Sequence, residues 1–413
     1  MYGPVARIPQ NSDSQESRMT NRRHSQLTDF AVVAGIDLNG LGVLRALSRA
    51  GVPTVAIDTD FYKPTGATRS GEKVRVRSLS GSAFVEDLLQ LRRRFTGNPV
   101  LFLTQEASVA TVSAEGRRLE QNYRFTLPSQ ALVEDLLHKS RFQALAEKHG
   151  FPIPRAVRLT KAQGPGAADG LKFPCVLKPM TKDAAYGKRF AKAYRVASAK
   201  EVGALWSEMR AVVDEVIVQE WIEGSDSDVY FCLQYRAPHG GASVSFVGRK
   251  TVQWPILVGG TASCIPAPEV STELTALTSG FFDAVGFAGM GSMEYKRDTR
   301  DGRFYLVEPT IGRTDYQEEI ATLNGVNIPL AAYFSELGLE APAATGRAPL
   351  RAWRDPIGYA KARLAGAQDP TSRLAPGIEI CDAYFRAYDP LPYLALKLQP
   401  VCRRLSVLRR APG

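Results

Sequence analysis

The chain has 413 residues, of which 44% are hydrophobic and 23% are charged, as is ordinary for a soluble globular protein. Its length exceeds that of a usual single-core domain, so we expect two or three lobes. No apolar run approaches the roughly 18–20 residues that a membrane-spanning helix needs, which argues against an integral membrane protein.

The N-terminal residues and the cysteines indicate where the protein works. Residues 1–29 are polar, lack the apolar core of a signal peptide, and are predicted to form a disordered leader outside the fold. The five cysteines are scattered, odd in number and without CxxC or Cys/His ligand spacing. This pattern favours a reducing compartment and no zinc site, so we expect a cytoplasmic protein.

Residues 30–128 alternate short apolar runs with helical patterns, beginning with Phe30–Ile36 and Gly42–Ala50. Such alternation predicts a parallel sheet with helices on its faces. The turn Gly35–Gly42 joins the first strand to a helix, which is a natural place for an anion or a ligand. This turn lacks the GxGxxG fingerprint of dinucleotide-binding sites. Asp58, however, ends the next strand, as the acidic residue of such a site would. A structural tight turn and a dinucleotide site are therefore both possible interpretations.

Two helical stretches follow at residues 129–150 and end at Gly150, where we place a domain boundary. The pattern over residues 173–196 predicts a strand, a polar loop and a second strand. The loop contains Gly187 and is predicted to be a flexible cover over phosphates. Its basic residues are Lys182, Lys188 and Arg189.

The next part of the chain is β-rich between two predicted helices at residues 201–213 and 272–285. The runs VYFCLQYR and ASVSFVGRK are typical of antiparallel strands. GSMEYKRD and RFYLVEP predict a hairpin that turns at Asp301–Gly302. Residues 341–349 are predicted to be a linker.

The strand FPCVLKPM and the segment VQEWIEG together suggest a nucleotide site. Lys178 ends its strand before a proline, so its ammonium is held at a fixed strand end, although a lysine there is ordinarily a solvent-facing edge residue. In VQEWIEG the extended backbone suits the hydrogen-bonding edge of an adenine, and Trp221 and Ile222 supply an apolar wall. Asp228 or Glu223 is placed to bind ribose hydroxyls.

Glu294 and Glu308 are expected to be cross-strand neighbours, because about seven residues separate each from the predicted turn. Paired carboxylates that face a cleft repel unless a cation lies between them, and oxygen ligands with phosphate oxygens suit magnesium. The alternative is that each carboxylate pairs with a surface lysine.

Arg249 and Lys250 are either edge-strand charges or cations beside transferring phosphate, where positive charge stabilises the transition state. The four histidines suggest no catalytic role, and the sequence contains neither a Ser-His-Asp or Cys-His nucleophile nor a P-loop.

Residues 341–413 form a basic C-terminal segment, with twelve Lys/Arg and five Asp/Glu, so seven of the ten net positive charges lie there. A basic tail can meet acidic lipid or nucleic acid, but no nucleic-acid recognition motif accompanies the charge. The simplest interpretation is a solvated surface around a few docked helices, with aromatic residues as packing anchors. These are Trp353, Tyr359, Tyr384, Phe385, Tyr388 and Tyr393.

In chain order, Lys139, Lys178, the VQEWIEG segment, Glu294 and Glu308 resemble the ATP-grasp superfamily of carboxylate–amine ligases. The resemblance covers about residues 30–335. It implies an α/β and α+β fold, in which a Rossmann-like domain precedes a two-lobed ATP-grasp domain. The corresponding ranges are 30–128 and 129–340, followed by the basic segment 341–413.

The resemblance also implies site roles. Lys139 and Lys178 match the two lysines that contact phosphates. The adenine hinge is matched by Gln219, Glu220, Trp221 and Ile222, and the ribose acid by Asp228. Glu294 and Glu308 match the carboxylates that bind magnesium, or manganese in its place. The catalytic cations are then Arg249, Lys250 and Arg313.

One departure from the family pattern follows Glu308. The family commonly has Glu-x-Asn-Pro-Arg, whereas this chain has Glu308-Pro-Thr-Ile-Gly-Arg313. Thr310 takes the place of the asparagine that often completes the metal shell, and its oxygen could still serve magnesium. Arg313 is displaced along the chain relative to the family arginine.

The predicted function is an ATP-dependent ligase that joins a small-molecule carboxylate to an amine through an acyl phosphate. The alternatives are an ATP-binding regulatory or scaffold module without turnover, and a kinase-like transfer that stops at the acyl phosphate. We expect the protein to form a homodimer. We expect no specific nucleic-acid partner. A peripheral membrane or partner-protein contact through the basic C-terminal segment is also open.

Overall fold

A computed structural model describes residues 29–162, 164–180, 184–191, 193–238, 243–341 and 349–408. The predicted leader, apart from Asp29, lies outside the described residues, as do most of the predicted linker and Lys182. Among the described residues, no helix combines the length and the apolarity needed to cross a membrane.

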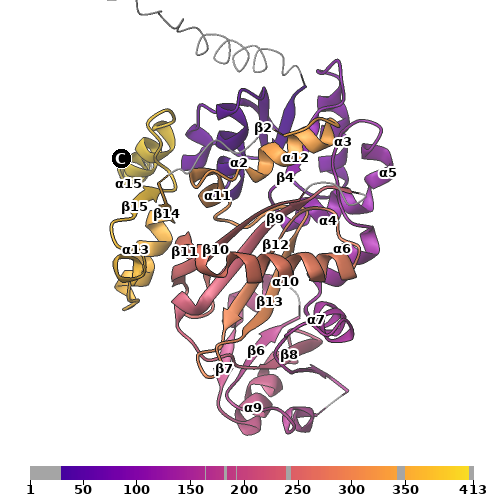
Figure 1. The fold of residues 1–413 in the computed structure, drawn as a ribbon, viewed down its shortest axis with the longest axis vertical. Coiled ribbons are helices and arrows are strands. Elements are labelled where there is room, and N and C mark those ends of the chain that lie inside the picture. The colour runs from indigo at the N-terminus through magenta and orange to yellow at the C-terminus, as the bar shows by residue number, and fades with distance from the viewer. Residues whose placement is uncertain are drawn as a thin grey trace, which may run out of the picture.

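The leading domain is built on the expected parallel sheet, with strand order β3-β2-β1-β4 (Figure 1). Its strands are β1 (Ala31–Ala34), β2 (Thr54–Asp58), β3 (Glu72–Arg75) and β4 (Val100–Leu103). Its helices are α2 (Leu38–Arg49), α3 (Gly81–Arg92), α4 (Glu106–Ala114) and α5 (Gly116–Leu119), with the 3-10 turn η2 (Pro64–Ala67). The order reverses at β1, so the loops after β1 and β4 flank a crevice in which such sheets bind ligands.

Two helices, α6 (Gln130–Leu137) and α7 (Lys139–Lys148), connect this domain to a small lobe. The small lobe has a four-stranded sheet in the order β5-β8-β6-β7. Its elements are β5 (Ala156–Thr160), η3 (Pro165–Ala168), β6 (Cys175–Pro179), α8 (Ala184–Arg189), β7 (Tyr194–Val196), α9 (Ala199–Met209) and β8 (Glu215–Glu220).

The main sheet has seven strands in the order β13-β12-β9-β10-β11-β14-β15. Its first five strands are β9 (Val229–Arg236), β10 (Ser243–Trp254), β11 (Gly260–Pro266), β12 (Gly289–Arg297) and β13 (Phe304–Ile311). The predicted antiparallel pair β9–β10 and the hairpin β12–β13 are confirmed. The remaining elements here are η4 (Asp226–Asp228), η6 (Pro268–Val270), α10 (Ser271–Ala284), α11 (Glu319–Leu323) and α12 (Ile328–Glu336).

The basic C-terminal segment does more than the few docked helices that we expected, because it extends the main sheet. β14 (Arg351–Arg354) pairs with β11, and β15 (Glu379–Asp382) pairs with β14. The segment also has α13 (Pro356–Leu364), α14 (Thr371–Leu374) and α15 (Leu391–Leu408). Trp353 and Tyr384 are buried as expected, whereas Phe385 and Tyr388 are exposed.

The buried cores divide the molecule into two bodies. Two apolar clusters each combine leading-domain residues with main-sheet residues, so these parts form one main body. A third cluster contains only small-lobe residues, among them Leu177, Trp206 and Val218. A lobe with its own core can shift as a unit relative to the main body.

The prediction of a flexible loop between β6 and β7 is wrong in part, because residues 184–189 form helix α8. The flanking strands pair as expected. Tyr186 explains the difference, since its ring is buried against the small-lobe core and its hydroxyl contacts the sulfur of Met209. Lys188 and Arg189 end this helix instead of lying in a loop.

Candidate functional site

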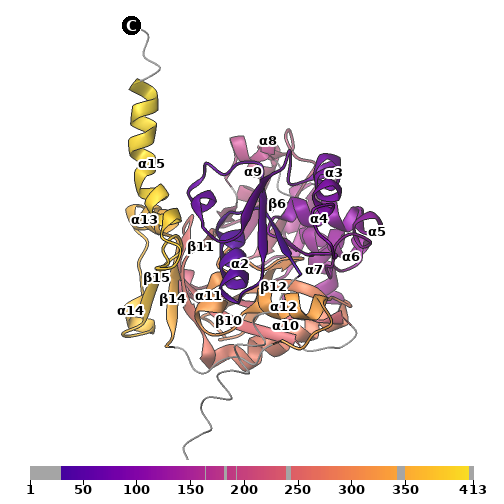
Figure 2. The same ribbon diagram turned by 90° about the horizontal axis from the view of Figure 1, so that it is seen from above.

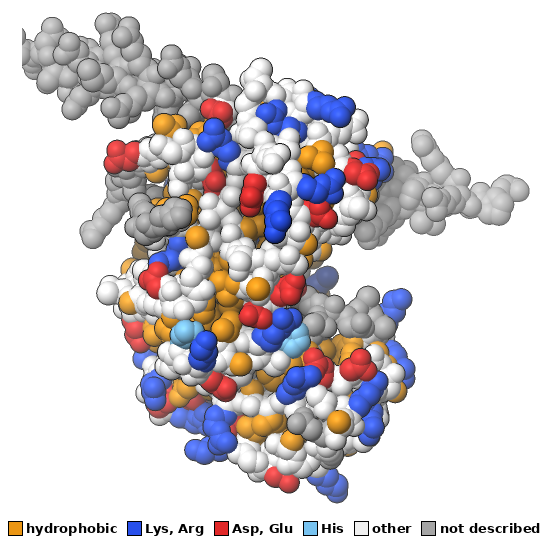
Figure 3. All heavy atoms as spheres, turned by 90° about the vertical axis from the view of Figure 1, so that its right-hand side faces the viewer, with side chains coloured by type: hydrophobic (Ala, Val, Ile, Leu, Met, Phe, Trp, Pro, Cys, Tyr) orange, Lys and Arg blue, Asp and Glu red, His pale blue; other side chains and the backbone are white. Residues whose placement is uncertain are grey.

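A cavity of about 590 Å³ lies between the small lobe and the main body. Figure 3 shows the surface hollowed above the small lobe, on a face where basic and acidic side chains are interspersed. The cavity is lined by eleven of the thirteen site residues predicted from sequence, together with others discussed below. The eleven are Lys139, Lys178, Gln219, Glu220, Trp221, Ile222, Lys250, Glu294, Glu308, Thr310 and Arg313. Only Asp228 and Arg249 do not line it.

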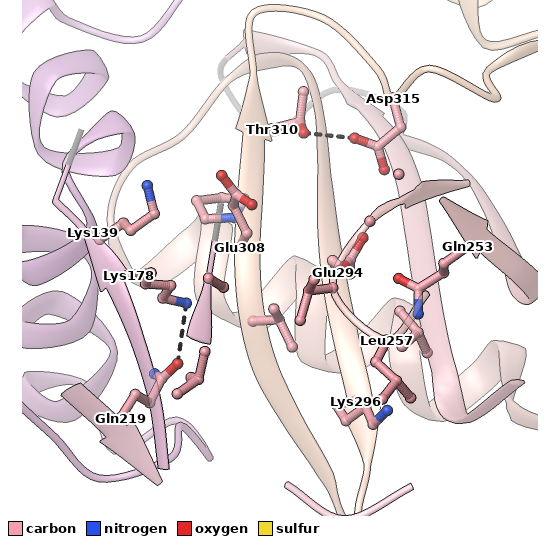
Figure 4. A pocket seen from close by; sticks show the side chains of 18 of the residues that line it. Lys139, Lys178, Gln219, Gln253, Leu257, Glu294, Lys296, Glu308, Thr310 and Asp315 are labelled. Carbon is pink, nitrogen blue, oxygen red and sulfur yellow. Dashed lines mark hydrogen bonds between the residues drawn. The ribbon is translucent and has the colours of Figure 1, made fainter. Parts of the chain in front are cut away.

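Lys178 reaches the cavity from the end of β6 and is held there by a short chain of amides. Its Nζ donates to Gln219 Oε1 at 3.2 Å, as Figure 4 shows. The amide of Gln219 in turn donates to Gln143 Oε1 at 3.0 Å. Gln143 lies on α7 and was missed from the sequence, because nothing local marks a helix glutamine as the partner of a distant strand.

Lys139 is the first residue of α7, and its Nζ donates to the carbonyl oxygen of Met180 at 3.4 Å. This carbonyl follows β6, so the two lysines come from different elements and meet beside the same strand end (Figure 4). The unpaired backbone N–H groups at the start of a helix add positive potential. The arrangement therefore favours an anionic group at this end of the cavity.

The segment after β8 forms an extended wall of the cavity. Glu220 Oε1 accepts from the backbone N–H of Lys172 at 2.9 Å, and the Trp221 N–H donates to the Pro174 carbonyl at 3.0 Å. The Trp221 ring packs under Arg195, whose guanidinium carbon is 5.5 Å from the ring centroid. These contacts fix the backbone, so that the remaining groups of residues 221–222 are preorganised beside the cavity.

Glu294 and Glu308 are direct cross-strand partners in the β12–β13 hairpin, as expected. Partners in an antiparallel pair point to the same face of the sheet. Ser292 and Thr310 form the next pair on that face. Figure 4 shows Glu308 on the side of the lysines and Glu294 on the side of Gln253.

Lys250 enters the same face from β10 and forms an ion pair with Glu294. Its Nζ lies 2.5 Å from Glu294 Oε2, and only 3% of its side chain is exposed. The same ammonium donates to Gln253 Oε1 at 3.4 Å. A buried lysine that pairs with a half-buried carboxylate balances its charge when no other cation is there.

Lys296 was missed from the sequence, although strand alternation places it two residues after Glu294 on the same face. Its Nζ donates to the carbonyls of Gly224 and Ser225 at 2.9 and 2.8 Å. Burial lowers the pKa of Lys296 below the ordinary value, and nearby carboxylates, Asp228 first among them, oppose this shift. Lys296 therefore ties the end of the hinge segment to the main sheet.

Thr310 and Asp315 form a second polar pair at the cavity wall, in which Thr310 Oγ1 donates to Asp315 Oδ1 at 2.6 Å (Figure 4). Among the described residues, no group of three or more His, Cys, Asp or Glu side chains is placed to hold a metal ion. Glu294 and Glu308 thus offer a site of two carboxylates. Such a site suits magnesium when phosphate oxygens complete its shell.

Arg249 and Asp228 do not line the cavity in the part of the chain described. Arg249 precedes Lys250 on β10, and successive side chains on a strand point to opposite faces. Its Nε donates to the Ser227 carbonyl, and its guanidinium lies over the Tyr230 ring. Asp228 accepts from the N–H and hydroxyl of Ser225 and so caps η4. The geometry gives both residues structural contacts instead of the predicted ligand contacts.

A second cavity, of about 740 Å³, adjoins the first at the crevice of the leading sheet. Arg313 and Tyr316 line both cavities. The second is also lined by Asn39 and Thr65, each only 4% exposed. Asn39 Oδ1 and Thr65 Oγ1 are buried without a hydrogen-bond partner in the structure. Buried polar atoms are normally satisfied, so these two are ready to bind a polar group.

The basic C-terminal segment contributes Tyr384 to this second cavity. Tyr316 is oriented by the same segment, since its hydroxyl donates to Asp355 Oδ2 at 3.1 Å. Arg313 donates to the Thr314 carbonyl at 3.1 Å, and no carboxylate pairs with it among the described residues. A half-buried guanidinium between two cavities is suited to a carboxylate or phosphate ligand.

No protein-family model matches the chain. It is 28% identical over 196 residues to D-alanine–D-alanine ligase of Pseudomonas putida, covering 46% of this chain and 58% of that ligase. The corresponding ligase of Halorhodospira halophila is 26% identical over 223 residues, covering 49% and 63%. The matches thus span less than two thirds of these curated relatives.

Solved structures share the fold over most of this chain. N5-carboxyaminoimidazole synthetase from Staphylococcus aureus, complexed with ADP, matches with a TM-score of 0.61 at 12% identity, covering 79% of this chain and 82% of that chain. The biotin carboxylase domain of Hydrogenobacter thermophilus 2-oxoglutarate carboxylase, in complex with MgADP, gives 0.61 at 15% identity, covering 79% and 74%.

Proposed function

We propose that this chain belongs to the ATP-grasp superfamily and is an ATP-dependent carboxylate–amine ligase; its fold and its similarity to D-alanine–D-alanine ligases support this. One observation carries the proposal. Two lysines and two paired carboxylates, drawn from the small lobe and the main body, line one cavity of about 590 Å³. This size lies within the usual range of small-molecule sites.

The size and the lining of the cavity suit a nucleoside triphosphate. One wall is apolar, with Val176, Trp221 and Ile222, and suits a flat base. Lys139 and Lys178 lie beyond it, where they would hold phosphates. The structures of two fold neighbours were obtained with ADP or MgADP, which supports ATP as the nucleotide here.

Glu294 and Glu308 would hold magnesium, or manganese, between their carboxylates and the phosphates. The donor set fits, because hard oxygen ligands are present and phosphates can complete a shell that the protein leaves open. When bound, the metal supplies charge neutralisation at the transferring phosphate. Thr310 is proposed to contribute its hydroxyl oxygen, with Asp315 fixing the orientation of that hydroxyl.

The reaction is proposed to occur in two steps. An oxygen of the substrate carboxylate displaces ADP from the terminal phosphorus of ATP, which gives an acyl phosphate. The nitrogen of the amine then attacks the acyl carbon and phosphate leaves with the bonding electrons, while the amine loses a proton. Lys250 and Arg313 stabilise the negative charge that develops, and the chain needs no covalent nucleophile.

The second cavity is proposed to receive the substrates, because it opens onto the first at Arg313 and Tyr316. Arg313 would bind the carboxylate that is activated. Asn39 and Thr65, with their unsatisfied oxygens, would bind donors on the substrate. The proposal leaves out the ribose role of Asp228 and the phosphate role of Arg249 that the sequence suggested, because neither residue lines the cavity.

We also propose that the chain is divided into residues 1–29, 30–128, 129–340 and 341–413. We propose that the protein is a cytoplasmic homodimer. The basic C-terminal segment is proposed to contact a membrane or a partner protein.

The test is release of ADP and phosphate by the purified protein with Mg-ATP, using pools of carboxylic acids and amines. Glu308→Gln should lower turnover by about 10²–10³-fold. Glu273→Gln is the matched control, since Glu273 is exposed on α10 outside the cavity.

Three outcomes separate the alternatives. Release that needs both an acid and an amine, and is lost in Glu308→Gln, supports the ligase. Release with an acid alone indicates a kinase-like transfer. Magnesium-dependent ATP binding without turnover in any pool would overturn the ligase in favour of a binding module.

A further inference from the structure

Helix α15 is anchored to the main body at its start and extends away from it. Asp389, just before the helix, is buried and accepts from Arg45 Nε at 2.9 Å and from Thr68 Oγ1 at 2.7 Å. Tyr393 and Leu396 pack against one of the two main-body cores. Beyond these turns α15 extends outward, as Figure 2 shows, and its 18 residues correspond to about 27 Å.

Three leucines at the start of α15 are exposed on one side of the helix. They are Leu391, Leu394 and Leu398, and the last two are 49% and 57% exposed. At 3.6 residues per turn, their spacing of three and four places them within an arc of about 60°. Tyr393 and Leu396, which pack on the body, lie on the opposite side of the helix. The exposed stripe therefore faces away from the anchoring contacts.

The sequence around this stripe is cationic. Residues 391–413 contain five Lys/Arg and no Asp or Glu. Lys397 is exposed within the described part of the helix, close to the ring of Tyr393. A helix that combines an apolar stripe with basic residues is suited to the interface of an anionic bilayer, where the leucines leave water and the basic groups meet lipid phosphates.

We propose that α15 lies in the surface of an anionic lipid bilayer, with Leu391, Leu394 and Leu398 buried at the boundary between headgroups and acyl chains. The helix lies on the membrane instead of crossing it, in agreement with the absence of a membrane-spanning helix among the described residues. Charge complementarity decides between a bilayer and a protein groove. A segment with five Lys/Arg and no Asp or Glu matches a continuous anionic surface without requiring a particular partner shape.

The test is co-sedimentation of the full chain with vesicles of phosphatidylcholine alone or mixed with phosphatidylglycerol. We expect binding to the mixed vesicles only, and weaker binding as salt is raised, because the Debye length shortens. Leu394→Glu/Leu398→Glu should lower the bound fraction about tenfold. Lys397→Glu, which keeps the leucines, should also weaken binding to mixed vesicles.

Leu339→Glu is the matched control, because Leu339 is 53% exposed but follows α12 in the chain and belongs to neither α15 nor its exposed stripe. It should bind as the unchanged chain does. Absent binding to mixed vesicles, or binding that the double leucine variant retains, would overturn the proposal. So would self-association in lipid-free solution that the same variant abolishes, since a second copy would then cover the stripe. The vesicle experiment uses no substrates, so its outcome does not test the ligase proposal.

Discussion

The ammonium of Lys250 lies 2.5 Å from Glu294 Oε2, so a buried lysine already neutralises one of the two carboxylates proposed to hold magnesium. A metal bound between Glu294 and Glu308 would compete with this ion pair. Lys250 would then be released toward the phosphates, carrying its charge to the place where negative charge develops. We therefore propose that this pair links metal binding to the position of the Lys250 ammonium.

Lys250→Met tests this link. It should lower kcat about 10²–10³-fold, because a preorganised cation at the reacting phosphate is lost. Arg249→Met is the matched control, since its side chain lies on the other face of β10 and makes structural contacts. We expect that variant to be less stable to heat but to keep kcat within about threefold. Equal losses of kcat in both variants would contradict the assignment.

The Thr310 hydroxyl is proposed to face the metal while it donates to Asp315. Thr310→Val removes the oxygen at nearly constant size, so we expect the magnesium concentration for half-maximal activity to rise about tenfold. Thr310→Asn, which introduces the residue that the family commonly has there, should restore it. A magnesium titration of ADP release checks both, and an unchanged magnesium requirement in Thr310→Val would exclude the hydroxyl from the metal shell.

Glu318 predicts a dependence of stability on pH. It is fully buried, both carboxylate oxygens lack a hydrogen-bond partner, and burial, with the neighbouring Glu319 charge, raises its pKa to about 8. A folded-state pKa above the unfolded value of 4.5 means that the folded protein binds the proton more tightly. The free energy of unfolding should therefore fall as pH rises from about 4.5 to about 8.

Glu318→Gln should remove this loss, so that the variant gains a few kcal/mol over the unchanged chain near pH 8 and little near pH 5. Chemical denaturation at the two pH values measures it. Glu319→Gln is the contrasting variant, because Glu319 pairs with Arg45 at 3.4 Å and with Arg386 at 2.7 Å. That variant should be destabilised at both pH values. A pH-independent effect of Glu318→Gln would refute the raised pKa.

The buried pair between Asp389 and Arg45 is expected to contribute to the stability with which the basic C-terminal segment is attached. Asp389→Ala removes the shorter of the two ion pairs of the buried Arg45 guanidinium, which keeps Glu319 at 3.4 Å, and it also removes the acceptor of the Thr68 hydroxyl. These losses should cost about 3–5 kcal/mol of unfolding free energy. Glu379→Ala breaks an exposed pair with Arg351 and should cost about 0–1 kcal/mol. Denaturant unfolding compares the two variants. A similar small cost for both would show that the segment is not held by its buried pair.

The elements that depend on local pattern could be predicted from the amino-acid sequence. Alternating apolar runs gave the parallel leading sheet, and the equal spacing of Glu294 and Glu308 about a turn gave their pairing. Strand ends also placed Lys178 and the hinge residues at the cavity. These predictions succeeded because hydrophobic period and hairpin register are set by residues close together in the chain.

Which charged side chains contact one another could not be predicted without the folded structure. From the sequence, Arg249 and Lys250 were given the same role. In the structure their side chains lie on opposite faces of β10, so that Lys250 pairs with Glu294 and Arg249 packs over the Tyr230 ring. The roles of Gln143 and Lys296 depend on partners that lie far away in the chain. The physical reason is that a side chain's electrostatic partner is fixed by packing across elements, and no local pattern encodes that packing.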